Sequence, residues 1–133
     1  MGTYGTQGTP APGNVPGARG GAIVWSDGTG QIWLFGGQGY GATGTTGGNA
    51  ALNDLWNYNL TTQQWTWVNG GQTSNNAASA VYGTQGTGAT TNVPGGRQLG
   101  SGWIDSTGHL WLFGGGGYDT TGNVGDLNDL WKF

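Results

Sequence analysis

Cysteine and glutamate are both absent from this chain of 133 residues, and its only basic residues are Arg19, Arg97 and Lys132. Without cysteine, neither disulfides nor thiolate metal sites arise. Three cations within a net charge of −3 cannot form the basic patch that duplex nucleic acid or an anionic membrane needs. No apolar run approaches the length of a membrane span or of a signal-peptide core. We therefore expect no nucleic-acid partner, no membrane partner and no signal peptide within these residues.

Glycine, by contrast, supplies 32 residues and tryptophan eight, while only 7% of the residues are charged. The glycines follow no three-residue period, which excludes collagen, and the tryptophans indicate apolar surface that must be buried. This composition is typical of many short strands joined by turns. Low lysine with high glycine, threonine and asparagine favours a bacterial extracellular or cell-surface protein.

The chain contains two copies of one pattern. Four segments recur, the first three at a spacing of 78 residues and the last at 75: Tyr4–Thr9 as Tyr82–Thr87, Asn14–Arg19 as Asn92–Arg97, Trp33–Gly37 as Trp111–Gly115, and Leu52–Trp56 as Leu127–Trp131. A change of three residues in one loop explains the shorter spacing, and loops tolerate such changes.

Each copy consists of short runs with strand character. In the first copy we expect antiparallel strands over residues 22–25, 32–35, 55–58 and 65–68, separated by glycine-rich turns. The second copy stops at Phe133, which matches Tyr58, so we expect its outer strand to be lacking. No stretch carries a sustained helical period. The prediction is an all-β fold of about seven antiparallel strands.

These residues resemble the kelch repeats of bacterial proteins and of galactose-oxidase-like β-propellers. Kelch repeats carry a double glycine after the second strand, a tyrosine shortly after it, and a tryptophan on the third or fourth strand. The matching positions are Gly36, Gly37, Tyr40 and Trp56 or Trp65 in the first copy, and Gly114, Gly115, Tyr118 and Trp131 in the second. The resemblance implies propeller blades, with Trp33 and Trp111 as further structural residues. Residues 1–71 would form one blade with an N-terminal loop, and residues 72–133 a long loop and an incomplete blade.

Two blades cannot close a ring of four to eight blades, and each needs neighbours on both faces. We therefore predict a scaffold or protein-interaction module that forms a homo-oligomer, either a ring of six or eight blades or an open stack. The alternative is a fragment of a longer kelch propeller.

A ligand-binding face is predicted from strand direction. The long connections over residues 38–53, 69–96 and 116–128 would share one face, because antiparallel strands alternate in direction. Long loops on a rigid scaffold often carry binding residues. We expect exposed tyrosines there that suit a carbohydrate or a protein: Tyr4, Tyr40, Tyr82 and Tyr118. The alternative is that these rings only fill gaps between loops.

Catalysis is not expected. The single histidine, His109, stands where the first copy has Gln31, and general acid–base chemistry favours paired carboxylates or a histidine in a pocket. Copper chemistry of the galactose-oxidase kind would need cysteine. No cofactor is predicted.

Two roles are open for the aspartates. Arg19 and Arg97 recur once per copy, as do Asp54 and Asp129, which suggests a repeated ion pair, within or between blades, that ties the loop before the third strand to the first strand. The alternative is a calcium site in a glycine-rich loop, where four oxygen-bearing residues cluster: Asp119, Asn123, Asp126 and Asp129.

Overall fold

The computed structural model describes residues 1–43, 50–73 and 79–133, and this part of the chain is all-β without helices. It therefore contains no helix that could cross a membrane. The strands are β1 (Arg19–Gly20), β2 (Ile23–Ser26), β3 (Gln31–Phe35), β4 (Gln38–Gly39), β5 (Leu55–Asn59), β6 (Gln64–Asn69), β7 (Arg97–Gln98), β8 (Ser101–Ile104), β9 (Leu110–Tyr118) and β10 (Val124–Lys132).

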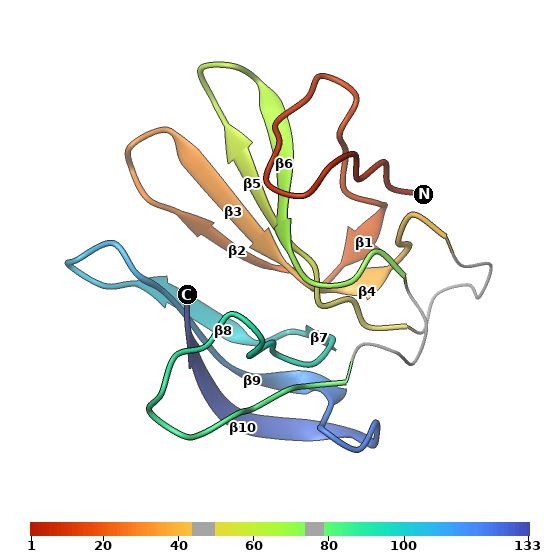
Figure 1. Cartoon of the computed structure of the whole chain (residues 1–133), viewed down its shortest axis with the longest axis vertical. Coiled ribbons are helices and arrows are strands. Elements are labelled where there is room, and N and C mark those ends of the chain that lie inside the picture. The colour runs from red at the N-terminus through yellow and green to blue at the C-terminus, as the bar shows by residue number, and fades with distance from the viewer. Residues whose placement is uncertain (44–49, 74–78) are drawn as a thin grey trace.

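Two antiparallel sheets account for most of the strands (Figure 1). The first repeat forms a four-stranded sheet in the order β2-β3-β5-β6, and β1 and β4 pair beside it. In the second repeat β9 is central, with β10 on one side and β7 and β8 along the other. The seven strands expected from sequence correspond to β2, β3, β5, β6, β8, β9 and β10.

The sequence repeat is also a repeat of strand register. Arg19 lies opposite Gly39 in the first repeat, and Arg97 lies opposite Gly117 in the second. Because both members of the pair move by 78 residues, the two repeats are built alike around their arginines. This equivalence allows each contact in one repeat to be compared with the same position in the other.

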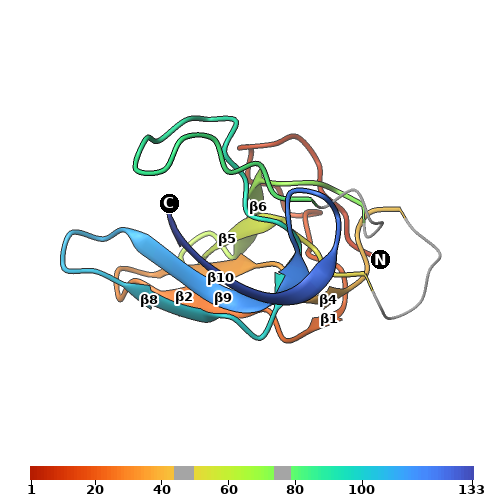
Figure 2. The ribbon, with the colours of Figure 1, turned by 90° about the horizontal axis from the view of Figure 1, so that it is seen from below.

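The main hydrophobic core lies between the two sheets. Ile23, Trp25, Phe35 and Leu55 from the first repeat pack with Leu110 and Leu112 from the second. Figure 2 shows β2 and β8 side by side, and the Trp25 indole nitrogen donates a hydrogen bond to the carbonyl of Trp111 at 2.9 Å. Each sheet thus buries one face against the other, as stacked repeat units do.

The prediction of a long loop in the second repeat is wrong. The connection over residues 116–128 was expected to be a long loop, but β9 and β10 run through it as a hairpin, with Gly117 opposite Gly125. The glycines there can pair because their small size lets β7 approach β9. An ideal Cβ on Gly117 would lie 2.2 Å from the carbonyl oxygen of Gly96. In the first repeat, the predicted loop over residues 38–53 begins as strand β4, and its residues 44–49 lie outside the described part of the chain.

Candidate functional site

An arginine–aspartate pair occupies the same place in both repeats. The guanidinium of Arg19 donates to both carboxylate oxygens of Asp54, at 2.5 and 2.8 Å. Arg97 does the same to Asp129, with its second nitrogen at 2.8 Å. Each arginine also donates to two backbone carbonyls, of which one belongs to the first residue of the double glycine. The pair therefore ties the start of each repeat to its third strand.

A tyrosine and a tryptophan complete each pair. The hydroxyl of Tyr4 donates to Asp54 at 2.5 Å, and the indole nitrogen of Trp56 donates to the same carboxylate oxygen at 2.7 Å. Tyr82 and Trp131 bond Asp129 in the same way, at 2.9 and 2.7 Å. The repeated tyrosines at positions 4 and 82 thus have a structural role, because each donates a hydrogen bond to a buried or partly buried carboxylate.

This bonding corrects the prediction for Tyr4, whose side chain was expected to be exposed but has only 3% of its surface accessible. Its ring packs against Trp56 at 4.7 Å and against Trp67 at 5.5 Å between centroids. Tyr82 is 39% exposed, because its ring stacks on Trp131 alone. The difference comes from β6, which covers the tyrosine of the first repeat and has no counterpart in the described second repeat.

The environment of each group shifts its ionisation. Burial raises the pKa of Tyr4 well above its usual 10, and the neighbouring Asp54 carboxylate raises it further. For Asp129, burial raises the pKa, but hydrogen bonds from Arg97 and Trp131 lower it by more, so the pKa lies below its usual value. Both groups therefore hold the protonation state that their bonds require at neutral pH.

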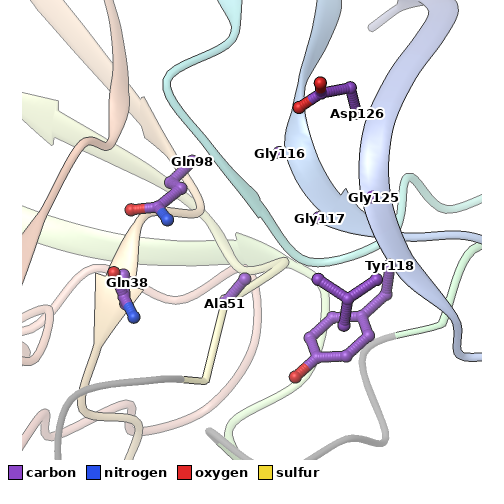
Figure 3. Close-up of a pocket in the computed structure, with 9 residues that line it drawn as sticks. Gln38, Ala51, Gln98, Gly116, Gly117, Tyr118, Gly125 and Asp126 are labelled. Atoms are coloured by element: carbon purple, nitrogen blue, oxygen red, sulfur yellow. The ribbon is translucent and has the colours of Figure 1, made fainter.

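A small cavity of about 210 Å³ lies between the two repeats (Figure 3). The side-chain amides of Gln38 and Gln98 lie on one side and the carboxylate of Asp126 on the other, with the Tyr118 ring below. The rest of its lining is Ala51, Gly116, Gly117, Val124 and Gly125. Amide and carboxylate groups around a small cavity can hydrogen-bond a ligand that carries several hydroxyls.

The other two tyrosines differ from each other. Tyr118 was expected to be exposed but is 6% exposed and packs with Ala51, where it lines the cavity. Tyr40 is 38% exposed. The carbonyl of Tyr40 lies only 1.8 Å from an ideal Cβ placed on Gly17, so the backbones of these two residues pack tightly together. Of the four rings that were predicted to be exposed, Tyr40 and Tyr82 are exposed, and Tyr4 and Tyr118 are buried.

The calcium alternative is not supported by the arrangement of its residues. Asp119 accepts hydrogen bonds from the backbone amides of Thr121 and Asn123, which closes the β9–β10 turn, while Asp129 binds Arg97. Within residues 1–43, 50–73 and 79–133, no three acidic or histidine side chains gather as metal ligands would.

His109 lies near Asp105, with Nδ1 3.3 Å from a carboxylate oxygen, at a turn where both side chains are partly exposed. Asp105 accepts bonds from the Thr107 hydroxyl and the Trp111 indole, and these bonds lower its pKa. Asp27 closes the matching turn of the first repeat through the amides of Thr29 and Gln31. Both aspartates therefore stabilise turns.

Uncovered apolar faces were expected from the sequence, but the residues that form the open face of the second repeat were not identified. Trp103, Phe113 and Leu130 are 45%, 45% and 54% exposed. Gly102 faces Trp25 of the first repeat. Because successive side chains of a strand point to opposite faces, this alternation could have placed the three exposed residues on the side away from the first repeat. The open face of the first repeat carries Val24, which is 56% exposed, with Ile32 and Leu34 partly buried.

No protein-family model matches this chain, and no curated protein matches its sequence.

Proposed function

We propose that this chain is a non-enzymatic module of two kelch-type β-propeller blades, which acts as a scaffold by docking further copies of itself onto its open faces. The double glycines, the repeated ion pairs and the face-to-face packing of the two sheets support this proposal. The division into blades at residue 71 is part of it. So is the bacterial extracellular or cell-surface location that the composition favours.

One observation carries the proposal: the same repeat position is buried in the first repeat and exposed in the second. Phe35 is 1% exposed and its counterpart Phe113 is 45%; Leu55 is 4% exposed and its counterpart Leu130 is 54%. The first repeat is covered by the second. A surface that covers the second repeat in the same way must resemble the inner face of the second repeat.

The open face of the first repeat has that resemblance. Ile32 and Leu34 stand 78 residues before Leu110 and Leu112, which are the two core residues that the second repeat supplies. A second copy can therefore dock its first repeat onto the second repeat of the copy before it. Such contacts are head to tail, so three or four copies would close a ring of six or eight blades, and unclosed contacts would give an open stack. In a longer kelch propeller, further blades of the same polypeptide would cover both faces.

The mass of the chain in solution at micromolar concentration tests this proposal. We expect light scattering to give about three or four times the chain mass of 13.6 kDa. The change Leu130→Asp places a charge on the open face and should return the protein to one chain. Leu60→Asp is the matched control in the β5–β6 turn, where Leu60 is 51% exposed, and should leave the mass unchanged. A wild-type protein that stays a single chain contradicts the assembly.

A carbohydrate-binding module is the second candidate, favoured by the cavity between the repeats. Gln38, Gln98 and Asp126 give it amide donors and a carboxylate acceptor, and its volume suits one sugar ring more than an oligosaccharide. On a glycan array, we expect any specific signal to fall at least tenfold in Asp126→Asn, because an amide nitrogen replaces one of the two acceptor oxygens of the carboxylate. Asp27→Asn, in the distant β2–β3 turn, is the control. A glycan signal that Asp126→Asn leaves unchanged contradicts binding in this cavity.

A further inference from the structure

The outer strand of the first repeat is held on both edges. On one edge β6 pairs with β5, and on the other it accepts hydrogen bonds from the N-terminal segment (Figure 1). The amide of Gly8 donates to the carbonyl of Trp67 at 2.8 Å, and the Asn14 side chain donates to the carbonyl of Trp65 at 3.0 Å. The N-terminal segment thus acts as one wall of a slot in which β6 lies.

The second repeat has the same wall with the same internal bonds. We name residues 83–92 the wall segment. In it Thr87 donates to the Thr84 carbonyl at 3.0 Å, and the Asn92 side chain donates to the Thr87 carbonyl at 3.1 Å. The counterparts 78 residues earlier make both bonds, each at 3.0 Å. The φ angles of Gly8 and Gly86 are 75° and 78°. The wall segment therefore has the strand-holding conformation, although none of the described strands pairs with it.

The groups that hold β6 in the first repeat are unused in the second. Among the described residues, the amides of Gly86 and Ala89 have no hydrogen-bond partner, and β10 pairs only with β9. Tyr82 is 39% exposed where Tyr4 is 3% exposed, and Trp131 is only partly buried where Trp56 is fully buried. Within the described part of the chain, both strand-holding edges and the aromatic rings are thus present in the second repeat, and no strand pairs with the outer edge of β10.

We propose that this 133-residue chain binds an extended, uncharged peptide between β10 and the wall segment. The peptide would add a strand to the sheet and carry tryptophans at two alternate positions, as Gln64–Asn69 does. Its backbone would bond β10 on one edge and the wall segment on the other. Exposed strand edges bind peptides in this manner, with backbone bonds for affinity and side-chain pockets for specificity.

The aromatic floor specifies the two tryptophans. In the first repeat Trp65 packs edge-on against Trp56 at 6.2 Å, and Trp67 packs edge-on against Tyr4 at 5.5 Å. The corresponding rings in the second repeat are Trp131 and Tyr82. Residues 81–93 carry no charged side chain, and Asp129 is neutralised by Arg97, so the slot suits an uncharged strand. Because the wall is already ordered, binding costs little further conformational entropy.

A labelled peptide with the sequence of residues 62–71, Thr-Gln-Gln-Trp-Thr-Trp-Val-Asn-Gly-Gly, tests this proposal by fluorescence anisotropy with the full chain. We expect saturable binding at one site per chain. The control peptide carries Thr66→Pro. It keeps both tryptophans but lacks the amide that faces β10, because the carbonyls of Trp65 and Trp67 face the other edge. It should bind at least tenfold more weakly, as should a peptide with Trp67→Ala.

Two variants of the chain locate the peptide. Tyr82→Ala should weaken binding at least tenfold, whereas Tyr40→Ala, which removes a ring of equal exposure elsewhere, should leave it unchanged. The proposal is overturned if the proline peptide binds as tightly as its parent, or if Tyr82→Ala has no effect. The peptide comparison uses the unchanged chain, so it does not depend on the folding of any variant. It is also independent of the open faces, since a single chain contains the whole slot.

Discussion

Replacing Arg97 with alanine should lower the free energy of unfolding by about 3–5 kcal/mol, because it leaves the carboxylate of Asp129 without its partner. The Arg97 side chain is fully buried and that of Asp129 is 13% exposed. The same change removes the guanidinium bonds to the carbonyls of Gly95 and Gly114. Surface substitutions cost far less, so a loss of this size identifies a buried pair.

Thermal or urea unfolding measures the effect, and a fall in the melting temperature on the order of 10 °C or more is expected. Lys132→Ala is the matched control. Lys132 is exposed and its ammonium lies 5.8 Å from the Trp111 ring, a contact worth about 0.5–1 kcal/mol. An Arg97→Ala protein with the same melting temperature as the wild type would show that the pair contributes nothing to stability.

A pair of engineered cysteines should join separate copies covalently, and its position follows from the contact inside the chain. An ideal Cβ on Gly102 lies 2.7 Å from the Cγ2 of Ile23, so these two positions are within disulfide reach. Val24 occupies the repeat position of Gly102, and Ser101 occupies that of Ile23. Val24 and Ser101 are both exposed and lie on opposite open faces.

If copies dock as the repeats do, Val24→Cys of one copy meets Ser101→Cys of the next. The wild-type chain contains no cysteine, so no other disulfide competes. Each single-cysteine variant is its own control, because it can link at most two chains.

Sequence reasoning was most successful where the two repeats share a residue. The double glycines, the strands before and after them, and the pairing of Arg19 with Asp54 could all be predicted, since each recurs at a fixed spacing. A buried charge needs a partner, and Arg19 and Arg97 recur at one position of the repeat while Asp54 and Asp129 recur at another.

The tyrosines could not be placed in this way, because their burial depends on contacts distant in sequence. Tyr4 is covered by Trp67, which is 63 positions away, and its hydroxyl bonds a carboxylate 50 positions away. The hairpin over residues 116–128 was missed for a similar reason. Glycines indicate loops locally, but here they pair with β7 and β10, which approach closely.

The most direct test of the docking of open faces is a non-reducing gel of the double variant Val24→Cys, Ser101→Cys after mild oxidation. Our account predicts a ladder of covalent species that ends at three or four chains for a closed ring, or continues upward for an open stack, and that collapses to one band on reduction. The single variants should give no species above two chains. A double variant that remains one chain, with both thiols free, would contradict the proposal that the open faces meet as the two repeats do.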